Sequence, residues 1–198
     1  MPRKNTKSKR IILELLHHPE GSLTKYRIAK ETGTNISWVI HFLRKLEKKK
    51  LVKNTKVTGF SGLVDYYIAL CGKTKQLDFH LPQPLEYLKK SGMEYALTTY
   101  SAENLISHHL FPSRTDVYVK NEDIEEWKKE LFSKGLAGKG NLRLLVANDN
   151  YLFKFTQKIK GLNVVSIPLL MIDLKKEGGV CLQAYEHLAK QYVSGQRD

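Results

Sequence analysis

Hydrophobic residues recur with a helical period through the first fifty residues of the chain, and this period predicts three helices. The first predicted helix covers residues 6–18 and the third covers residues 35–50. The second begins at a cap, either Ser22 or Thr24, and ends at Thr32. Their expected buried residues are Ile12, Leu15 and Leu16 in the first, Tyr26, Ile28 and Ala29 in the second, and Val39, Phe42, Leu43 and Leu46 in the third. Gly33 is the expected left-handed stop of the second helix.

A β-hairpin is predicted after the third helix. Residues 51–57 are rich in β-branched side chains, and residues 59–62 (Gly-Phe-Ser-Gly) supply a turn. Residues 64–70 then alternate, with Tyr66, Ile68 and Leu70 on one face. Three helices that close one core, followed by a hairpin, predict a small domain over residues 1–72.

The rest of the chain mixes helical and strand patterns. Residues 73–84 are polar, interrupted by prolines and free of periodicity, so they are expected to form a linker. Strands are expected at residues 95–99, 115–120, 142–147, 151–156 and 162–167, and helices at residues 101–110, 121–134 and 168–176 and from the Gly178-Gly179 pair through Tyr192. The predicted fold class is therefore α+β, with a second, mixed α/β-type domain over residues 85–198.

Charge separates the two predicted domains. The chain has a net charge of +13, and residues 1–75 hold 17 lysines and arginines against 5 acidic residues, a net charge of +12. Residues 76–198 hold 16 basic and 15 acidic residues, a net charge of +1. A surface that only has to stay in solution carries charges of both signs, as the second domain does. The excess in the first domain therefore favours a polyanionic partner.

The third helix combines a buried stripe with a polar, cationic face. The residues on its outer face and first turn are Asn35, Ser37, Trp38, His41, Arg44 and Lys45, and Lys53 and Lys56 flank the hairpin. Asparagine suits paired hydrogen bonds with adenine, and arginine or lysine suits guanine, in the major groove of DNA. The hairpin lysines suit phosphates or a narrow minor groove. We therefore expect these eight residues to bind double-stranded DNA.

Three apolar residues near this face have more than one interpretation. Trp38 fits the core as well as the groove, although its neighbours are polar. Ile36 and Ile40 stand one turn apart outside the buried stripe. They fit contact with thymine methyl groups, packing under the hairpin, or a dimer surface, and the sequence leaves these alternatives open.

A characteristic run of residues spans the second and third helices and the start of the hairpin. It comprises residues 26–39 (YRIAKETGTNISWV) and 43–52 (LRKLEKKKLV), with a small residue in the second helix, a turn glycine four residues later and Leu-Glu-Lys-Lys before a hydrophobic strand. This run resembles the winged helix-turn-helix of bacterial and archaeal transcription regulators, which implies DNA binding. Lys50 stands where many members have glycine, and lysine suits that position if its φ stays negative.

The second predicted domain lacks the sequence patterns of common active sites. It contains no GxSxG, Walker or GxGxxG motif, and Asp116, Asp149 and Asp173 are isolated carboxylates. The histidines at 17–18 and at 108–109 are adjacent pairs, whose side chains diverge on a helix instead of sharing a metal. We therefore expect no enzymatic activity, no cofactor and no metal.

The compartment is expected to be the cytoplasm. Cys71 and Cys181 are far apart in sequence and form no metal-binding motif, which fits buried thiols in a reducing environment. Apolar runs fall short of the roughly 20 residues that a membrane span needs. The basic N-terminus is not followed by the apolar segment of a secretory signal. No membrane partner is therefore expected.

Two stretches of the second domain carry a further resemblance. Residues 95–102 (YALTTYSA) precede a helix and the strand of residues 116–119 (DVYV), and residues 165–174 (VSIPLLMIDL) precede residues 184–188 (AYEHL). These stretches resemble the AbiEi family of antitoxin regulators, although Thr98-Thr99 stands where that family usually has Thr-Gly. The resemblance implies a repressor of its own operon, joined to a partner-binding or dimerisation domain, with a cognate toxin encoded beside it in a type IV toxin-antitoxin system.

Two other functions fit the same sequence. In one, the second domain is an enzyme that acts on nucleotides or nucleic acid, and convergent carboxylates or histidines in one pocket would favour it. In the other, the winged helix binds protein or RNA. A two-fold operator requires two recognition helices about 34 Å apart, so a homodimer or two monomers on an inverted repeat is implied.

Overall fold

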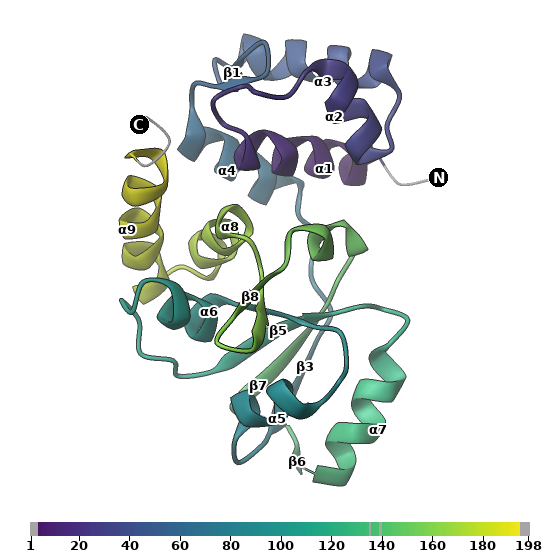
Figure 1. Cartoon of the computed structure of the whole chain (residues 1–198), viewed down its shortest axis with the longest axis vertical. Coiled ribbons are helices and arrows are strands. Elements are labelled where there is room, and N and C mark those ends of the chain that lie inside the picture. The colour runs from purple at the N-terminus through teal and green to yellow at the C-terminus, as the bar shows by residue number, and fades with distance from the viewer. Residues whose placement is uncertain (1–3, 135, 139, 195–198) are drawn as a thin grey trace. The chain divides into compact units, whose positions relative to one another are not determined.

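The computed structural model describes residues 4–134, 136–138 and 140–194. The extreme ends of the predicted domains, residues 1–3 and 195–198, therefore lie outside the described residues. The chain divides into two compact units, residues 1–72 together with 190–198, and residues 73–189 (Figure 1). Within the described part of the chain, no helix is both long enough and apolar enough to span a lipid bilayer.

The N-terminal unit contains the three predicted helices and a hairpin. Its elements are α1 (Lys4–His17), α2 (Lys25–Thr32), α3 (Ile36–Lys48), β1 (Val52–Lys53), β2 (Lys56–Val57) and α4 (Phe60–Leu70). Thr24 caps α2, because its side chain accepts a hydrogen bond from Arg27 N at 3.1 Å, and Gly33 ends the helix with a φ of 61°. Apolar side chains from all four helices are buried together, including Leu16, Ile28, Leu43 and Leu63.

The hairpin lies earlier in the sequence than predicted. Its turn is formed by Asn54 and Thr55, and the expected strand at residues 64–70 is part of helix α4. Asn54 has a φ of 58°, a left-handed conformation that asparagine adopts readily in a two-residue hairpin turn. The buried residues Leu63, Val64 and Tyr67 follow a helical spacing, whereas the alternating Tyr66, Ile68 and Leu70 are only half-buried.

Two burial predictions for the N-terminal unit are wrong. Tyr26 is 72% exposed, because the buried face of α2 consists of Ile28, Ala29 and Thr32, which excludes position 26. Cys71, at the end of α4, is only partly buried, whereas Cys181 of the second unit is buried as expected.

The second unit is built around a mixed sheet of seven strands in its described residues. The strands are β3 (Gln76–His80), β4 (Ala96–Thr98), β5 (Thr115–Val119), β6 (Leu136–Ala137), β7 (Leu142–Val146), β8 (Gln157–Ile159) and β9 (Leu162–Val164). Their order is β6-β3-β7-β5-β4-β9-β8. The pairs β5–β7 and β4–β9 are parallel and the other pairs are antiparallel. The predicted α+β fold class is thus confirmed.

Helices cover both faces of this sheet (Figure 1). They are α5 (Pro84–Lys90), α6 (Thr99–Ile106), α7 (Ile124–Lys134), α8 (Ile167–Glu177), α9 (Val180–Ser194) and the 3-10 helix η1 (Asn150–Phe155). On one face, Asp173 of α8 bonds to Thr98 and Tyr118. On the other face, the fully buried Trp127 of α7 lies 6.4 Å from the ring of Tyr95, just before β4.

Two segments of the second unit differ from their predicted structure. Residues 150–155, expected as a strand, form η1, and Asp149 caps it by accepting a hydrogen bond from Tyr151 N at 3.2 Å. Strand β3 lies inside the segment expected as a linker, where it pairs with β7. Only Phe79 of β3 is buried, so the strand depends on pairing with distant residues and leaves no alternating pattern.

Candidate nucleic-acid interface

Helix α3 begins at a side-chain cap. The side chain of Asn35 accepts a hydrogen bond from Ser37 N at 2.7 Å, while its own backbone stays extended, with a ψ of 140°. Asn35 is exposed, and so is Ser37 two residues later. The cap therefore fixes where the exposed face of α3 begins. A contact of Asn35 with a base remains a prediction.

The exposed face of α3 carries a straight row of polar side chains. Val39, Phe42, Leu43 and Leu46 are buried, as predicted. The row opposite them is made of Ser37, His41, Arg44 and Lys48, all exposed and spaced by four, three and four residues. Lys48 was not among the predicted DNA-binding residues, although its position seven residues after His41 places it on this row. We call these four residues the α3 row.

Trp38 and Lys45 lie beside the α3 row. Trp38 is half-buried, with its ring 6.2 Å from that of His41. Lys45 is exposed, and its Nζ lies 5.8 Å from the ring of Tyr66 in α4, as does Nζ of Lys49. Tyr66 also contacts the core residue Phe42, ring to ring at 6.2 Å. An aromatic face therefore positions two ammonium groups at the edge of α3, a role missed in the sequence because Tyr66 was assigned to a strand.

The wing, residues 52–57, places two lysines opposite each other. Lys53 and Lys56 are direct partners across the hairpin, and both are exposed. Like charges at directly opposed positions of a hairpin are destabilising. An anion bound beside Lys53 and Lys56 would offset this repulsion, so the pair suits an anionic partner.

Hydrogen bonds attach the wing to the helices. Asn54 N donates to a side-chain oxygen of Glu47 in α3 at 2.8 Å. The hydroxyl of Thr55 donates to Gly21 O at 3.2 Å, and Val57 N donates to Pro19 O at 2.8 Å. The wing is thus fixed to α3 and to the loop between α1 and α2, which keeps its lysines in a constant position relative to the α3 row.

The junction between α3 and the wing contains a left-handed lysine. Lys50 has a φ of 57°, so the condition under which lysine was expected to suit this position, a negative φ, is not met. Lys50 N donates to Glu47 O at 2.8 Å and Leu51 N donates to Leu46 O at 3.1 Å, the pattern of a Schellman motif. This motif requires a left-handed residue after the helix cap, and the chain uses lysine there.

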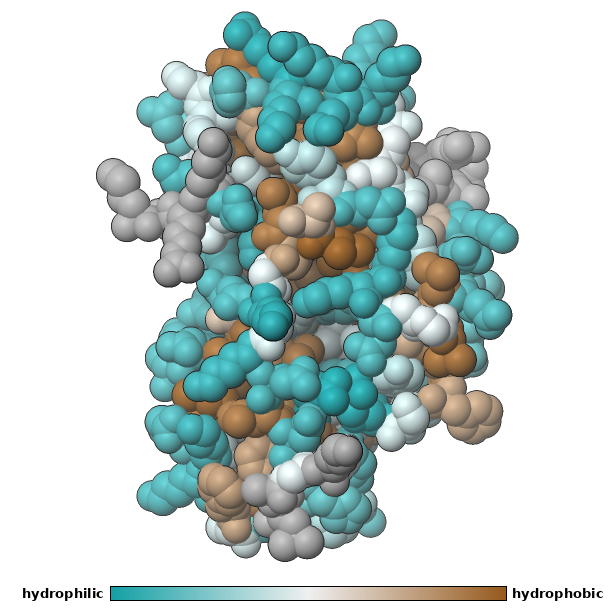
Figure 2. Space-filling view, turned by 180° about the vertical axis from the view of Figure 1, so that it is seen from behind, coloured by the Kyte–Doolittle hydropathy of each residue, from teal (hydrophilic) through white to brown (hydrophobic). Residues whose placement is uncertain are grey.

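Positive charge is concentrated on α3 and the wing. Residues 44–57 contain seven lysines and arginines, all exposed, and one acidic residue, Glu47. In Figure 2, hydrophilic side chains cover much of the end of the N-terminal unit that carries α3, at the top of the view. This surface attracts polyanions, and the α3 row offers hydrogen-bond donors at its centre.

The second unit contains a buried polar network. Asp116 accepts hydrogen bonds from Thr99 Oγ1 at 2.5 Å and from Arg114 Nη2 at 2.8 Å. Asp173 accepts from Thr98 Oγ1 at 2.7 Å and from the hydroxyl of Tyr118 at 2.9 Å. Burial raises the pKa of Asp173 to about 6, although these two hydrogen bonds act in the opposite direction. The two carboxylates therefore tie α8 and the start of α6 to strands β4 and β5.

This network lacks the arrangement of a metal centre. Among the residues that the structure describes, no group of three or more histidines, cysteines or carboxylates is placed to hold a metal ion. Asp116 and Asp173 are each satisfied by neighbouring donors, which fits a structural role. His109 stacks on His187 at 5.1 Å, which places the loop after α6 against α9.

The N-terminal unit is a winged helix-turn-helix, because α1–α3 enclose one core and the β1–β2 wing follows α3 directly. Comparisons with models of protein families, with curated protein sequences and with solved structures found no match. The fold of this unit and the charge and shape of its α3 surface are therefore the basis for assigning a function.

Proposed function

We propose that the protein is a sequence-specific, double-stranded DNA-binding regulator of transcription. The observation that carries the proposal is the α3 row, in which Ser37, His41, Arg44 and Lys48 face solvent along the helix, opposite its buried stripe. A major groove admits one α-helix, and arginine and lysine side chains read guanine there. The buried stripe holds α3 rigidly, as a recognition helix requires.

The wing adds contacts that are independent of sequence. Lys53 and Lys56 lie opposite each other on a hairpin whose position relative to α3 is fixed through Glu47. Contacts from such lysines to phosphates set the register of a protein on the duplex. In this proposal α3 reads bases, while the wing, with Lys45 and Lys49 beside Tyr66, binds the backbone.

The biological role proposed for this activity is repression. The resemblance of the second unit to AbiEi antitoxin regulators supports a cytoplasmic repressor of its own operon, with a cognate toxin as a partner of the second unit. The buried network around Asp116 and Asp173 supports a binding module more than an enzyme, because its carboxylates are satisfied internally.

The test combines selection of bound DNA with single substitutions. Fragments of the source genome that the full-length protein retains are sequenced, and their affinities are measured by fluorescence anisotropy. Arg44→Ala is expected to weaken binding to the selected site by about 5- to 150-fold, the loss of 1–3 kcal/mol typical of a base contact. Lys129→Ala removes the same charge from an exposed position on α7 and is expected to leave affinity unchanged.

Salt dependence separates DNA binding from the alternatives. A protein that contacts about six phosphates loses roughly a thousandfold in affinity between 50 and 200 mM salt, whereas a protein interface responds much less. Equal affinity of the wild type, Arg44→Ala and Ser37→Ala for every retained fragment would refute the assignment of α3 as the recognition helix. Tighter binding to RNA than to duplex DNA would refute the DNA target.

A further inference from the structure

An exposed aromatic side chain lies on a hydrogen-bonded loop of the second unit. Phe111, between α6 and β5, is 96% exposed. The residue before it is fixed on both sides, because Leu110 N donates to the buried carboxylate of Glu103 at 2.7 Å and Leu110 O accepts from Asn104 Nδ2 at 2.8 Å. Glu103 also accepts a hydrogen bond from Ser107 Oγ. A fixed loop presents Phe111 with little further loss of conformational entropy on binding.

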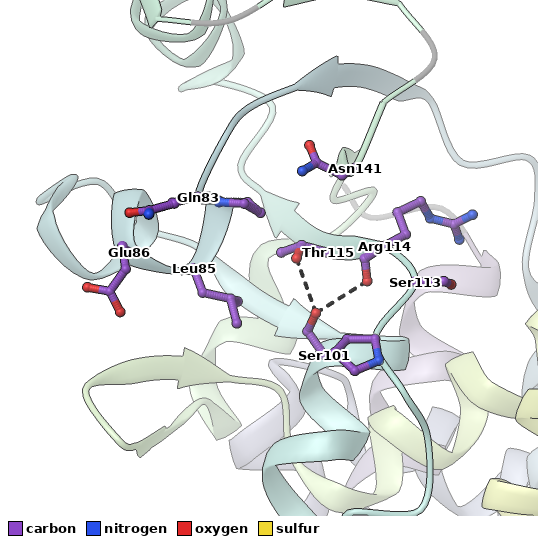
Figure 3. Close-up of a pocket in the computed structure, with 10 residues that line it drawn as sticks. Gln83, Leu85, Glu86, Ser101, Ser113, Arg114, Thr115 and Asn141 are labelled. Atoms are coloured by element: carbon purple, nitrogen blue, oxygen red, sulfur yellow. Dashed lines mark hydrogen bonds between the residues drawn. The ribbon is translucent and has the colours of Figure 1, made fainter.

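A pocket begins at the next residue of the same loop. Pro112 and Ser113 line it together with Pro84 and Leu85 of α5 (Figure 3). Its volume is about 390 Å³. Since a cavity of about 150 Å³ is enough to hold benzene, this pocket has room for a phenyl ring.

Several of the polar groups that line the pocket, among them Ser101, Thr115 and Asn141, are already bonded within the protein. Ser101 Oγ lies 3.2 Å from Arg114 O and 3.1 Å from the hydroxyl of Thr115, the two contacts drawn in Figure 3. The amide of Asn141 bonds to the backbone N and O of Leu81 at 2.9 and 2.8 Å. A guest therefore has few unpaired groups to bond with, which favours an apolar guest.

Arg114 is also unavailable to an anionic ligand in this pocket. Its guanidinium donates to Asp116 and, at 2.9 Å, to Glu177. These partners hold the pKa of Arg114 far above its ordinary value, mainly through the hydrogen bond to Asp116. The pocket consequently presents the apolar surfaces of Pro84, Leu85 and Pro112 without a free cation.

We propose that a second copy of this chain occupies the pocket, with Phe111 of each copy inserted beside Pro112 of the other. In a two-fold dimer the same surface patch of each copy contacts that of the other. If an inserting side chain and the pocket that receives it lie on one patch, the dimer therefore forms the contact twice. Phe111 and Pro112 are adjacent in one loop and meet this condition. Residues 76–198 carry a net charge of only +1, so two copies associate there without the repulsion that the +12 of residues 1–75 creates.

The first test measures self-association of the full-length protein without DNA, by sedimentation equilibrium over a range of concentrations. The wild type is expected to form a dimer, and Phe111→Ala is expected to raise its dissociation constant by about 30-fold or more, as for a central aromatic anchor. Phe132→Ala changes another exposed phenylalanine, 60% exposed on α7, and is expected to leave the dimer intact. Far-UV circular dichroism verifies that each variant is folded.

A complementation test identifies the acceptor. Ser113→Trp adds a large side chain at a residue that lines the pocket, so this variant alone is expected to be monomeric, like Phe111→Ala. A mixture of the two variants retains one intact pair, Phe111 of the Ser113→Trp chain and the pocket of the Phe111→Ala chain. The mixture is therefore expected to form a heterodimer that neither variant forms as a homodimer.

Three results would each overturn the proposal: a wild type that stays monomeric at every concentration, a Phe111→Ala variant that dimerises like the wild type, and a mixture that fails to associate. A wild type that stays monomeric and instead binds a different protein through Phe111 would likewise overturn the proposal. The measurement contains no DNA, so its outcome is independent of whether α3 binds DNA.

Discussion

At the scale of single residues, five non-glycine residues of the described chain adopt a left-handed backbone conformation that favours glycine, and two of them, Thr99 and Lys50, bear on the predictions. Thr99 has a φ of 48° and Lys50 a φ of 57°. Such conformations cost on the order of 1–3 kcal/mol for a β-branched residue. Thr99 offsets this cost by its hydrogen bond to the buried carboxylate of Asp116.

Lys50 gives the cleaner prediction, because its side chain is exposed. Lys50→Gly is expected to raise the free energy of unfolding by about 0.5–1 kcal/mol, since glycine adopts the left-handed conformation of the Schellman motif without a Cβ clash. Chemical denaturation of the full-length protein measures this change. Lys49→Gly, one residue earlier at a φ of −88°, is the matched control and is expected to give no gain. A loss of stability in Lys50→Gly would contradict the left-handed assignment.

At the scale of elements, the strength of the periodic signal decides what the sequence predicts. Helices α1 and α3 carry wide apolar stripes, and the structure places them within a few residues of their predicted bounds. Helix α4 was mistaken for a strand, because Tyr66, Ile68 and Leu70 alternate by chance along a helix whose buried residues are Leu63, Val64 and Tyr67. Strand β3 was missed because only its pairing with the distant β7 defines it.

In the candidate site, too, the residues predicted correctly are those on an element with a strong periodic signal. The α3 row lies on a strongly amphipathic helix, so Ser37, His41 and Arg44 were placed on its outer face from spacing alone. Tyr66 approaches Lys45 and Lys49 only through the tertiary packing of α4 on the α3 side of the core. Asp173 bonds to Thr98 and Tyr118, which lie more than fifty positions away in the sequence, and no local pattern predicts such contacts.

The attachment of α8 to the sheet makes stability depend on pH. Burial raises the pKa of Asp173 from 3.8 to about 6, so between these values the folded state binds more protons than the unfolded state. The contribution of Asp173 to stability is therefore greatest below pH 3.8, and it falls as the pH rises to about 6. The expected loss is on the order of 2 kcal/mol.

Asp173→Asn removes this titration and is expected to flatten the stability profile. Relative to the wild type, its free energy of unfolding is expected to rise by about 2 kcal/mol between pH 4 and pH 7, measured by urea denaturation. Asp65→Asn, which changes an exposed carboxylate on α4, is the control and is expected to follow the wild-type profile. Parallel profiles for Asp173→Asn and the wild type would show that Asp173 titrates normally.

At the scale of the whole molecule, the two ends of the chain belong to the same compact unit. The predicted first domain ended at residue 72, but the unit also includes the chain from Lys190 onward. Tyr192 of α9 donates a hydrogen bond to Leu16 O in α1 at 3.0 Å, and its ring lies 5.8 Å from that of Phe60 in α4. Burial raises the pKa of this phenol to about 12. Residues far apart in the sequence therefore complete the N-terminal unit.

This arrangement predicts that the last turns of α9 stabilise the N-terminal unit. Tyr192→Phe keeps the ring but leaves Leu16 O without its donor, and it is expected to lower the free energy of unfolding by about 1 kcal/mol. Tyr192→Ala also removes the contact with Phe60 and is expected to cost about 3 kcal/mol or more. Hydrogen exchange of the α1 and α4 amides measures where stability is lost. Tyr26→Phe, at an exposed position on α2, is the control, and equal exchange in all three variants would mean that α9 does not support the unit that carries α3.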